Sequence, residues 1–305
     1  MITTVSAVIA TRNRVDELVE GLQRLSRQTM APAEVLVVDD ASTDGTSAVV
    51  RHDFPRVRLI RLPRNMGLIH ARNIGFVNTT GGYVLSLDDD SWFESQDGLA
   101  RALAFAESHD DVGAVALNVE TRDGLVYYPR DAAPFAVAHY TGCGHLLRRR
   151  AVEDAGLYID AFFRQGEEKD RGLRLMDAGW RITALPEVVV HHHKSEKGRS
   201  GATARYYDQR NDLIREIARC PVGLLPQRFL RTWAGHTWKN LRFGPRTTDL
   251  KVLLALPRIA RIGLRHREPV KVEVYRRWVE LARERQPGKI GFADAGAPPL
   301  HPAKG

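Results

Sequence analysis

Three consecutive carboxylates, Asp88, Asp89 and Asp90, directly follow the apolar segment 85–87. Adjacent like charges in a tight turn repel one another and raise their own pKa values unless a cation neutralises them. A hard divalent ion such as Mg²⁺ or Mn²⁺ binds carboxylate oxygens and usually shares the site with substrate phosphates. We interpret the cluster as a metal and phosphate site, with a solvated acidic loop as the alternative.

A second acidic cluster, Asp39-Asp40, follows the apolar run 35–38 and precedes Ser42, Asp44 and Gly45. In open α/β sheets, ligands bind at the carboxyl ends of the strands. A carboxylate in that position can accept hydrogen bonds from a nucleobase or a ribose. Asp, Ser and Gly are also common turn and capping residues, so the pattern alone leaves both interpretations open.

Two further clusters carry groups that could move a proton or bind a metal. Glu167 and Glu168 open an amphipathic helix, where acidic residues are favoured by the helix dipole but could also serve as a general base. The run 191–193 is three histidines after a β-branched segment. Alternate residues of a strand share a face, so His191 and His193 can point together and one of them could bind a metal.

The loop 64–67 leads into a predicted helix over 68–77. Gly67 allows the backbone to approach a ligand closely, and Arg72, one turn into the helix, could reach a base or a phosphate. The alternative for Arg72 is an ion pair at the protein surface.

The elements that must position these groups alternate as strand and helix through the first half of the chain, which predicts an α/β fold with a mostly parallel sheet covered on both faces. Val15, Leu18, Leu22 and Leu25 have helical spacing between the first two strands. Predicted strands are 5–10, 34–38, 57–62, 83–87, 112–117, 142–147 and 187–190.

Past residue 118 the pattern becomes irregular, with a hairpin turn predicted at Asp123-Gly124 and a helix over 167–178. Helical periodicity then dominates, over 206–219, 224–243, 249–265 and 270–285. We expect a catalytic domain over 1–200, a helical extension over 201–286 and a disordered tail rich in Gly, Pro and Ala over 287–305.

The composition of the 305-residue chain, 43% hydrophobic and 27% charged, excludes wholesale disorder, a collagen-like fibre and a polytopic membrane protein. Two cysteines cannot form a disulfide framework or a Cys-rich zinc site. No apolar run approaches the ~20 residues of a spanning helix, and the short apolar N-terminus lacks the features of a signal peptide. We expect a cytoplasmic protein.

Charge divides the chain after His193, with 21 Lys and Arg against 27 Asp and Glu before that point and 24 against 10 beyond it. The basic part could face phosphate, an anionic lipid headgroup or nucleic acid. Its arginines and lysines lie among tryptophans, phenylalanines and leucines, a pattern that suits either an anionic membrane surface or ordinary helix packing. A peripheral position at the inner face of the cell membrane therefore stays open.

In this order and at these separations, the clusters resemble the family 2 nucleotide-sugar glycosyltransferases, which have the GT-A fold. The resemblance extends from Val5 to about His193. It rests on 10–14, 38–46, 65–75, Asp88-Asp89-Asp90, 166–168 and His191.

The resemblance implies a role for each cluster. Thr11, Arg12, Asp39 and Asp40 would line the nucleotide-sugar site, with Asp39 on the nucleobase, and Arg72 would hold the base or the diphosphate. Asp88 and Asp90 would be the ends of the family's Asp-x-Asp motif, Asp89 lying between them in the donor site. Asp90 would contact Mn²⁺ or Mg²⁺ directly, Asp88 would lean toward the ribose, and His191 or His193 would complete the metal site.

The family's acceptor helix opens with a Glu-Asp pair whose Asp is the base, whereas this chain has Glu167-Glu168. Glu168 would therefore be the base, with one extra methylene, and Glu167 remains a candidate. The resemblance implies a metal-dependent, inverting transfer of a sugar from a nucleoside diphosphate to a hydroxyl of a glycan, glycolipid or other acceptor, as in cell-envelope polysaccharide synthesis. The alternatives are a nucleotidyltransferase on the same fold and a nucleic-acid-binding protein that uses the basic third.

Overall fold

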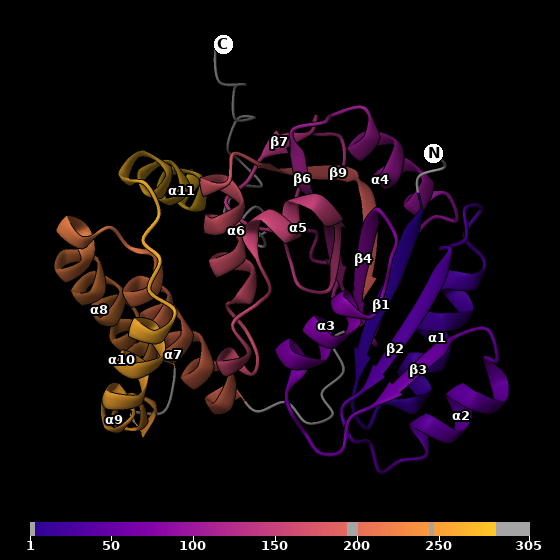
Figure 1. The fold of residues 1–305 in the computed structure, drawn as a ribbon, viewed down its shortest axis with the longest axis horizontal. Helices are drawn as coiled ribbons and strands as arrows, with labels where there is room; N and C mark the ends of the chain where they lie inside the picture. Colours follow the sequence, from indigo (N-terminus) through magenta and orange to yellow (C-terminus); the bar gives the residue numbers. More distant parts are fainter. Residues whose placement is uncertain (1–3, 194–200, 244–246, 285–305) are drawn as a thin grey trace.

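The computed structural model describes residues 4–193, 201–243 and 247–284, so the predicted tail 287–305 lies outside the described residues. One mixed sheet of nine strands, in the order β3-β2-β1-β4-β8-β6-β9-β5 with β7 paired to β9, forms the centre of the molecule (Figure 1). Its strands are β1 (Val5–Thr11), β2 (Glu34–Asp39), β3 (Arg58–Arg61), β4 (Tyr83–Asp88), β5 (Ser91–Phe93), β6 (Val112–Thr121), β7 (Phe135–Ala136), β8 (Gly144–Arg148) and β9 (Arg181–His192).

The predicted strands are confirmed, most of them to within one or two residues. β1, β2, β3 and β4 are parallel neighbours, and their carboxyl ends meet at one edge of the sheet. Two differences affect the site. β9 has 12 residues where the sequence predicted only 187–190, and the three-residue strand β5 was not predicted.

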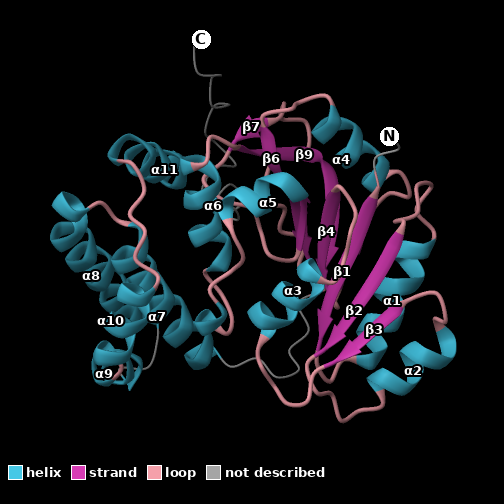
Figure 2. Cartoon of the chain, in the orientation of Figure 1, coloured by secondary structure: helices cyan, strands magenta, loops and turns pink. Residues whose placement is uncertain are grey.

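Helices cover both faces of the sheet (Figure 2). Side chains of α1, α2 and α4 share one hydrophobic cluster with the strands, and side chains of α3, α5 and α6 pack on the opposite face. The bounds are α1 (Val15–Ser26), α2 (Thr46–Asp53), α3 (Leu68–Val77), α4 (Gly98–Glu107), α5 (Arg149–Ala155) and α6 (Glu167–Asp177), with a 3₁₀ turn at Asp160–Phe162.

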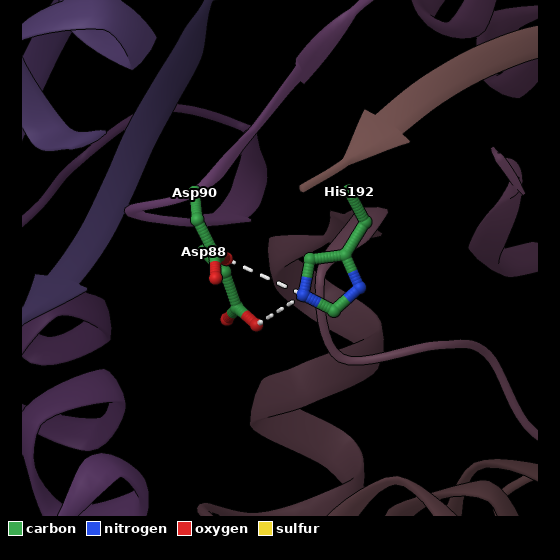
Figure 3. A group of neighbouring side chains, drawn as sticks. All are labelled: Asp88, Asp90 and His192. Atoms are coloured by element: carbon green, nitrogen blue, oxygen red, sulfur yellow. Dashed lines mark ion pairs between the residues drawn. The ribbon is translucent and has the colours of Figure 1, made fainter. Parts of the chain in front are cut away.

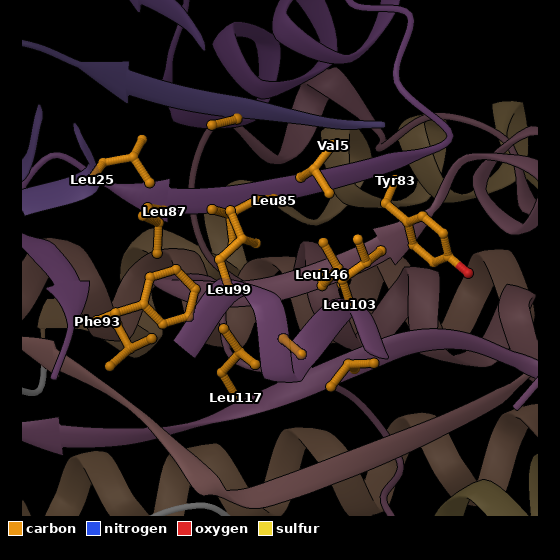
Figure 4. Packing of buried hydrophobic residues seen from close by; sticks show 14 of the residues in the cluster. Val5, Leu25, Tyr83, Leu85, Leu87, Phe93, Leu99, Leu103, Leu117 and Leu146 are labelled. Atoms are coloured by element: carbon orange, nitrogen blue, oxygen red, sulfur yellow. The ribbon is translucent and has the colours of Figure 1, made fainter. Parts of the chain in front are cut away.

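The core lies between the sheet and these helices, as the close packing of Leu85, Leu99 and Leu117 shows (Figure 4). All seven residues of β1 are buried, as expected for a parallel strand covered on both faces. Ile9 packs toward α1, whereas Val8 packs toward α3. A Cβ at Gly75 of α3 would overlap the Val8 side chain, so the glycine lets α3 approach the strand.

The described residues of the basic part form five helices beside α3 and α6, on the left in Figure 1. Leu213 and Ile214 pack with Ile69 and Phe162, and Trp278 packs near Leu173, so these helices share hydrophobic clusters with the α/β part. Their bounds are α7 (Gly201–Arg219), α8 (Leu225–Phe243), α9 (Thr247–Leu254), α10 (Leu256–Arg265) and α11 (Val272–Glu284), with a 3₁₀ turn at Val222–Leu224.

The single helix predicted over 249–265 is in fact two, α9 and α10, divided at Ala255. Pro257 lies in the first turn of α10, where its missing N–H breaks no helical hydrogen bond. Among the helices described, none has both the length and the apolar character needed to span a bilayer.

Candidate active site

Two carboxylates and one imidazole converge where β4 and β9 end (Figure 3). The Nε2 atom of His192 lies 3.3 Å from Asp90 Oδ1 and 3.9 Å from Asp88 Oδ2. One ligand atom from each of the three residues lies within 4.8 Å of the others. Asp90 is fully buried, and the Asp88 side chain is 18% exposed. Two carboxylates with an imidazole form a donor set that can bind a divalent cation.

The histidine that lies beside the aspartates is not one of the two that the sequence predicted. His192 is the histidine that faces Asp90. His191 lies 3.6 Å from Glu120, and the ring of His193 contacts that of Trp92 at 4.3 Å. Of the three histidines, His192 is therefore the one that lies beside the two aspartates, whereas His191 belongs to a second group with Glu94 and Glu120 whose ligand atoms also lie within 4.8 Å of one another.

The cause is the pairing of β9 with its neighbours. Along β6, Leu117 is opposite Leu185, but the next residue, Asn118, is opposite Val189. Three extra residues in β9 change which side chains face each side of the sheet, because side chains alternate along a strand. The unpredicted β5 then pairs Ser91 with His192, which fixes the histidine beside Asp90.

The charge of His192 is set by these neighbours. Burial lowers its pKa, but hydrogen bonding to Asp90 and Cys143 outweighs burial and raises the pKa to about 10. The imidazolium thus balances part of the negative charge of the aspartates. A metal-ligating histidine must be neutral, so a cation bound here would displace this proton.

A cavity of about 380 Å³ opens beside this cluster at the carboxyl ends of β1, β2 and β4. It is lined by five of the residues predicted to bind the donor: Thr11, Arg12, Asp40, Asp88 and Asp89. Asp89 accepts hydrogen bonds from Thr11 Oγ1 at 2.9 Å and from Arg14 at 2.8 Å. Burial raises the pKa of Asp89 to about 6, although Arg14 opposes the shift.

Asp39 and Asp40 differ in position. Asp39 is fully buried beneath the cavity, where its carboxylate accepts hydrogen bonds from the Ser42 backbone N–H and the Ser47 hydroxyl. Asp40 is the member of the pair that lines the cavity, and it accepts hydrogen bonds from the backbone N–H groups of Met66 and Gly67 at 2.6 and 2.9 Å. Of the two, Asp40 is therefore the residue that faces the cavity, and Asp39 holds the turn that follows β2.

Arg72 links the two acidic parts of the site. Its Nη2 atom donates to Asp88 Oδ1 at 2.7 Å and to the Gly142 carbonyl at 2.8 Å, and its Nη1 atom donates to Glu167 Oε1 at 2.5 Å. Only 4% of the side chain is exposed. The guanidinium predicted to hold a base or a diphosphate is therefore engaged by protein groups, in a buried ion pair rather than a surface one.

Glu167 and Glu168 begin α6, as predicted, but differ in exposure. The Glu167 side chain is 1% exposed and is held by Arg72, whereas Glu168 is half-buried. Burial and repulsion from Glu168 raise the pKa of Glu167 to about 8 against the effect of Arg72. Burial also raises the pKa of Glu168, again opposed by Arg72.

A second cavity, of about 790 Å³, adjoins the first, and Leu68, Asp88 and Arg164 line both. Glu168 and His192 also line the second cavity, on elements that are far apart in the sequence. A Cβ at Gly142 would overlap Glu168 Oε1, so the glycine makes room for the carboxylate.

Sequence reasoning assigned no role to three residues of the site: Arg14, Arg164 and His192. Arg14 follows the β1 end that supplies Thr11 and Arg12, and its charge beside two acidic clusters could have identified it. Arg164 lies between Phe163 and Gln165, both with φ in the left-handed region at 66° and 64°. Such strained backbone is common at functional sites but leaves no reliable mark in the sequence.

The fold and its two adjoining cavities define an α/β enzyme whose site lies at the carboxyl ends of parallel strands. Residues 6–156 match the profile of Glycosyl transferase family 2. A glycosyltransferase of Bacillus subtilis (strain 168), YwdF, described as uncharacterized, is 30% identical over 209 residues, which cover 64% of this chain and 75% of that protein. The chain belongs to glycosyl transferase family 2 and is a glycosyltransferase.

Two further comparisons extend beyond the matched segment. An N-acetylglucosaminyl-diphospho-decaprenol L-rhamnosyltransferase of Mycobacterium tuberculosis (strain ATCC 25618 / H37Rv) is 28% identical over 228 residues, or 60% of this chain and 74% of that one. The mannosyltransferase PcManGT of Pyrobaculum calidifontis, solved with GDP-Man and Mn²⁺, has a TM-score of 0.57 at 22% identity and covers 92% of this chain and 84% of its own. The predicted GT-A fold is confirmed.

Proposed function

We propose that this glycosyltransferase is a metal-dependent, inverting enzyme that transfers a hexosyl-type sugar from a nucleoside-diphosphate sugar to an acceptor hydroxyl. One observation carries the proposal. The two cavities meet at Asp88, with the Asp88, Asp90 and His192 cluster at the junction and Glu168 in the second cavity. This arrangement suits a donor in the first cavity and an acceptor in the second.

The smaller cavity provides the nucleotide site. Asp40 would accept a hydrogen bond from the base, and Thr11 and Arg12 would line the base and ribose. Arg14 holds Asp89 in place, and Arg164, which lines both cavities, would face the diphosphate. Cationic side chains at the phosphates offset the charge that grows on the leaving group.

The donor set fits a divalent metal ion. Mg²⁺ is bound almost entirely by oxygen ligands, so an imidazole beside Asp88 and Asp90 favours Mn²⁺ as the cofactor. Asp88, Asp90 and His192 would hold such an ion, which would neutralise charge on the departing diphosphate and so remove the need for a general acid on that side.

Glu168 is the proposed base. Both glutamates line the second cavity, but Glu167 is almost fully buried and bound to Arg72, whereas Glu168 is half-buried and has the more accessible carboxylate. A raised pKa makes a carboxylate a stronger proton acceptor near neutral pH. Because Arg72 binds Glu167 as well as Asp88, we assign Glu167 the task of orienting Arg72 between donor and acceptor.

The reaction is then a single displacement. The acceptor oxygen forms a bond to the anomeric carbon while the bond between that carbon and the diphosphate oxygen breaks, and Glu168 takes the hydroxyl proton. One displacement inverts the anomeric configuration. In well-oriented systems, alignment of two reactants lowers the activation free energy by up to ~7–11 kcal/mol. The two cavities would provide this alignment of donor and acceptor.

The acceptor class rests on the relatives. The mycobacterial relative is named for transfer to a lipid-linked diphospho-sugar. We infer an acceptor of similar chemistry, a glycan or lipid-linked sugar of cell-envelope polysaccharide synthesis, for the larger cavity.

Calorimetric titration with UDP, GDP and dTDP, each with Mn²⁺ and then with EDTA, tests the donor site. We expect one nucleotide to bind, and only with metal. NMR of the product formed from the matching nucleotide sugar should show inverted anomeric configuration. Metal-independent binding, retained configuration, or release of pyrophosphate in place of nucleoside diphosphate would each contradict the proposal.

A further inference from the structure

The outward face of α8 is apolar although it faces solvent. Leu230, Ala234, Trp238 and Leu241 recur at intervals of four, four and three residues and therefore share one face of the helix. Leu230, Trp238 and Leu241 are 68%, 66% and 58% exposed. A soluble helix normally turns such a stripe toward the core, so this face calls for a partner.

The adjoining helix α9 continues the apolar surface with Leu250, Leu253 and Leu254, the last of them 74% exposed. Nine of the twelve large hydrophobic side chains that the described residues expose lie between positions 222 and 264. Hydrogen bonds from Asn240 to Asp249 join the end of α8 to the start of α9, which keeps the two stripes adjacent. We call the exposed faces of α8, α9 and α10 the outer helical surface. The three helices lie on the side of the molecule away from the sheet (Figure 1).

The outer helical surface is also strongly basic. Residues 225–265 contain nine Lys and Arg and a single acid, Asp249, whose carboxylate accepts hydrogen bonds from Gln209, Thr237 and Asn240. Within the described part of the chain, no ion pair neutralises six of the exposed cations: Arg231, Arg242, Lys251, Arg258, Arg261 and Arg265.

Other basic residues of the C-terminal third are buried and are not part of this surface. Arg215 and Arg219 of α7 are buried and form ion pairs with Asp212, Glu216 and Asp170. They stabilise the packing of the helices and are not available to a partner. The net charge of the surface comes from α8, α9 and α10.

We propose that the outer helical surface docks the enzyme on an anionic lipid bilayer, with the leucines and Trp238 in the headgroup region and the arginines on the lipid phosphates. Exposed apolar side chains flanked by unpaired cations match the two components of such a surface. A second copy of the chain would bring like charges together, whereas an anionic bilayer neutralises them.

The position of this surface suits the proposed function, on which this step rests. Ala204 of α7 lines the acceptor cavity. Gln209, five residues further, donates to Asp249 of α9 and accepts from Asn240 of α8. At 1.5 Å per residue, the cavity wall and the helices of the docking surface are about 8 Å apart along α7. A lipid-linked acceptor in the same bilayer could therefore reach the cavity.

Co-sedimentation of the full chain with vesicles tests the proposal. We expect binding to vesicles of phosphatidylcholine mixed with phosphatidylglycerol, weak binding to phosphatidylcholine alone, and loss of binding at high salt. The substitutions Trp238→Ser with Leu254→Ser should lower the partition coefficient at least about tenfold, and Arg231→Glu should lower it at least about fivefold. Because these side chains are exposed, the variants should fold.

Val77→Ser with Leu157→Ser is the matched control, since both residues are exposed hydrophobics outside the surface. It should bind vesicles as the unchanged protein does. No sedimentation with anionic vesicles would overturn the proposal, as would equal binding by the Trp238 and control variants. Self-association in sedimentation velocity that disappears with Trp238→Ser, or preferential binding of RNA, would also overturn it. Nucleotide binding with Mn²⁺ should not change in these variants, so failure here is distinct from failure of the proposed activity.

Discussion

Replacement of Arg72 by glutamine should destabilise the protein more than loss of any surface ion pair. Arg72 is the shared partner of Asp88 and of Glu167, whose side chain is only 1% exposed. At pH 8 and above, where Glu167 is substantially ionised, removing one member of the buried pair leaves a buried charge and typically costs about 3–5 kcal/mol. A chain of this size loses about 2 °C of Tm per kcal/mol, so Tm should fall by about 6–10 °C.

The stability lost in Arg72→Gln should depend on pH, and the ionisation of Glu167 determines whether the loss is larger at high or at low pH. Burial and Glu168 raise the pKa of Glu167 from 4.5 to about 8, so the native state binds this proton more tightly than the unfolded chain. The stabilisation due to the proton is complete below about pH 4.5 and is lost as pH rises toward about 8. Arg72 favours the ionised form, so without it the pKa rises further and the variant loses more stability at pH 8 than near pH 5.

Thermal unfolding by calorimetry at both pH values measures these effects. Arg101→Gln is the control, because its ion pair with Glu187 is 38% and 51% exposed and should contribute about 1 kcal/mol or less. At pH 8, combining Arg72→Gln with Glu167→Gln should recover part of the loss of stability, since no unpaired Glu167 charge remains. The reasoning is refuted if Arg72→Gln costs no more than Arg101→Gln, or if the double variant is no more stable than Arg72→Gln.

Four further predictions concern the site. Asp90→Asn should weaken Mn²⁺-dependent nucleotide binding by at least about 10–100-fold in calorimetry, and unaltered binding by the variant would argue against the metal site. The Mn²⁺ affinity of the unchanged protein should rise with pH because the proton on His192, with a pKa of about 10, must leave. Glu168→Gln should lower kcat by about 10²–10⁴ with nucleotide Kd unchanged, and a fully active variant would exclude it as the base. Gly142→Ala should lose transfer activity and about 1–3 kcal/mol of stability because its Cβ meets Glu168. Gly82→Ala, whose nearest contact would be 3.9 Å away, is the control. Equal behaviour of the two variants would contradict the steric cause.

The parts of the fold and site that could be predicted from the sequence are those set by local pattern. Asp40 and Asp88 come at the ends of apolar segments that form parallel strands, and parallel strands bring their carboxyl ends to one edge. Glu168 could be predicted as a candidate base because it lies at the start of an amphipathic helix. The two acidic clusters therefore lie at one edge of the sheet, as expected from the strand-helix alternation.

The parts that could not be predicted depend on contacts between distant segments. His192 faces the aspartates because β9 gains three residues relative to β6, and a local alternation pattern cannot show such a shift. Asp39 and Asp40 are adjacent and chemically identical, and only the loop at Met66 shows which one lines the cavity. The basic third looked like one charged surface, yet Arg215 is buried among acids that are its neighbours only in the folded helices.

The cluster of Asp88, Asp90 and His192 also has a consequence for how the chain is made. Its aspartates emerge from the ribosome about a hundred residues before its histidine, so a nascent chain cannot complete the site until β9 has entered the sheet. An ion that binds only the completed cluster would stabilise the native state by about 2.7 kcal/mol at a concentration 100 times its Kd. That contribution would act at the junction of β5 and β9, holding the last strand of the catalytic sheet against local opening.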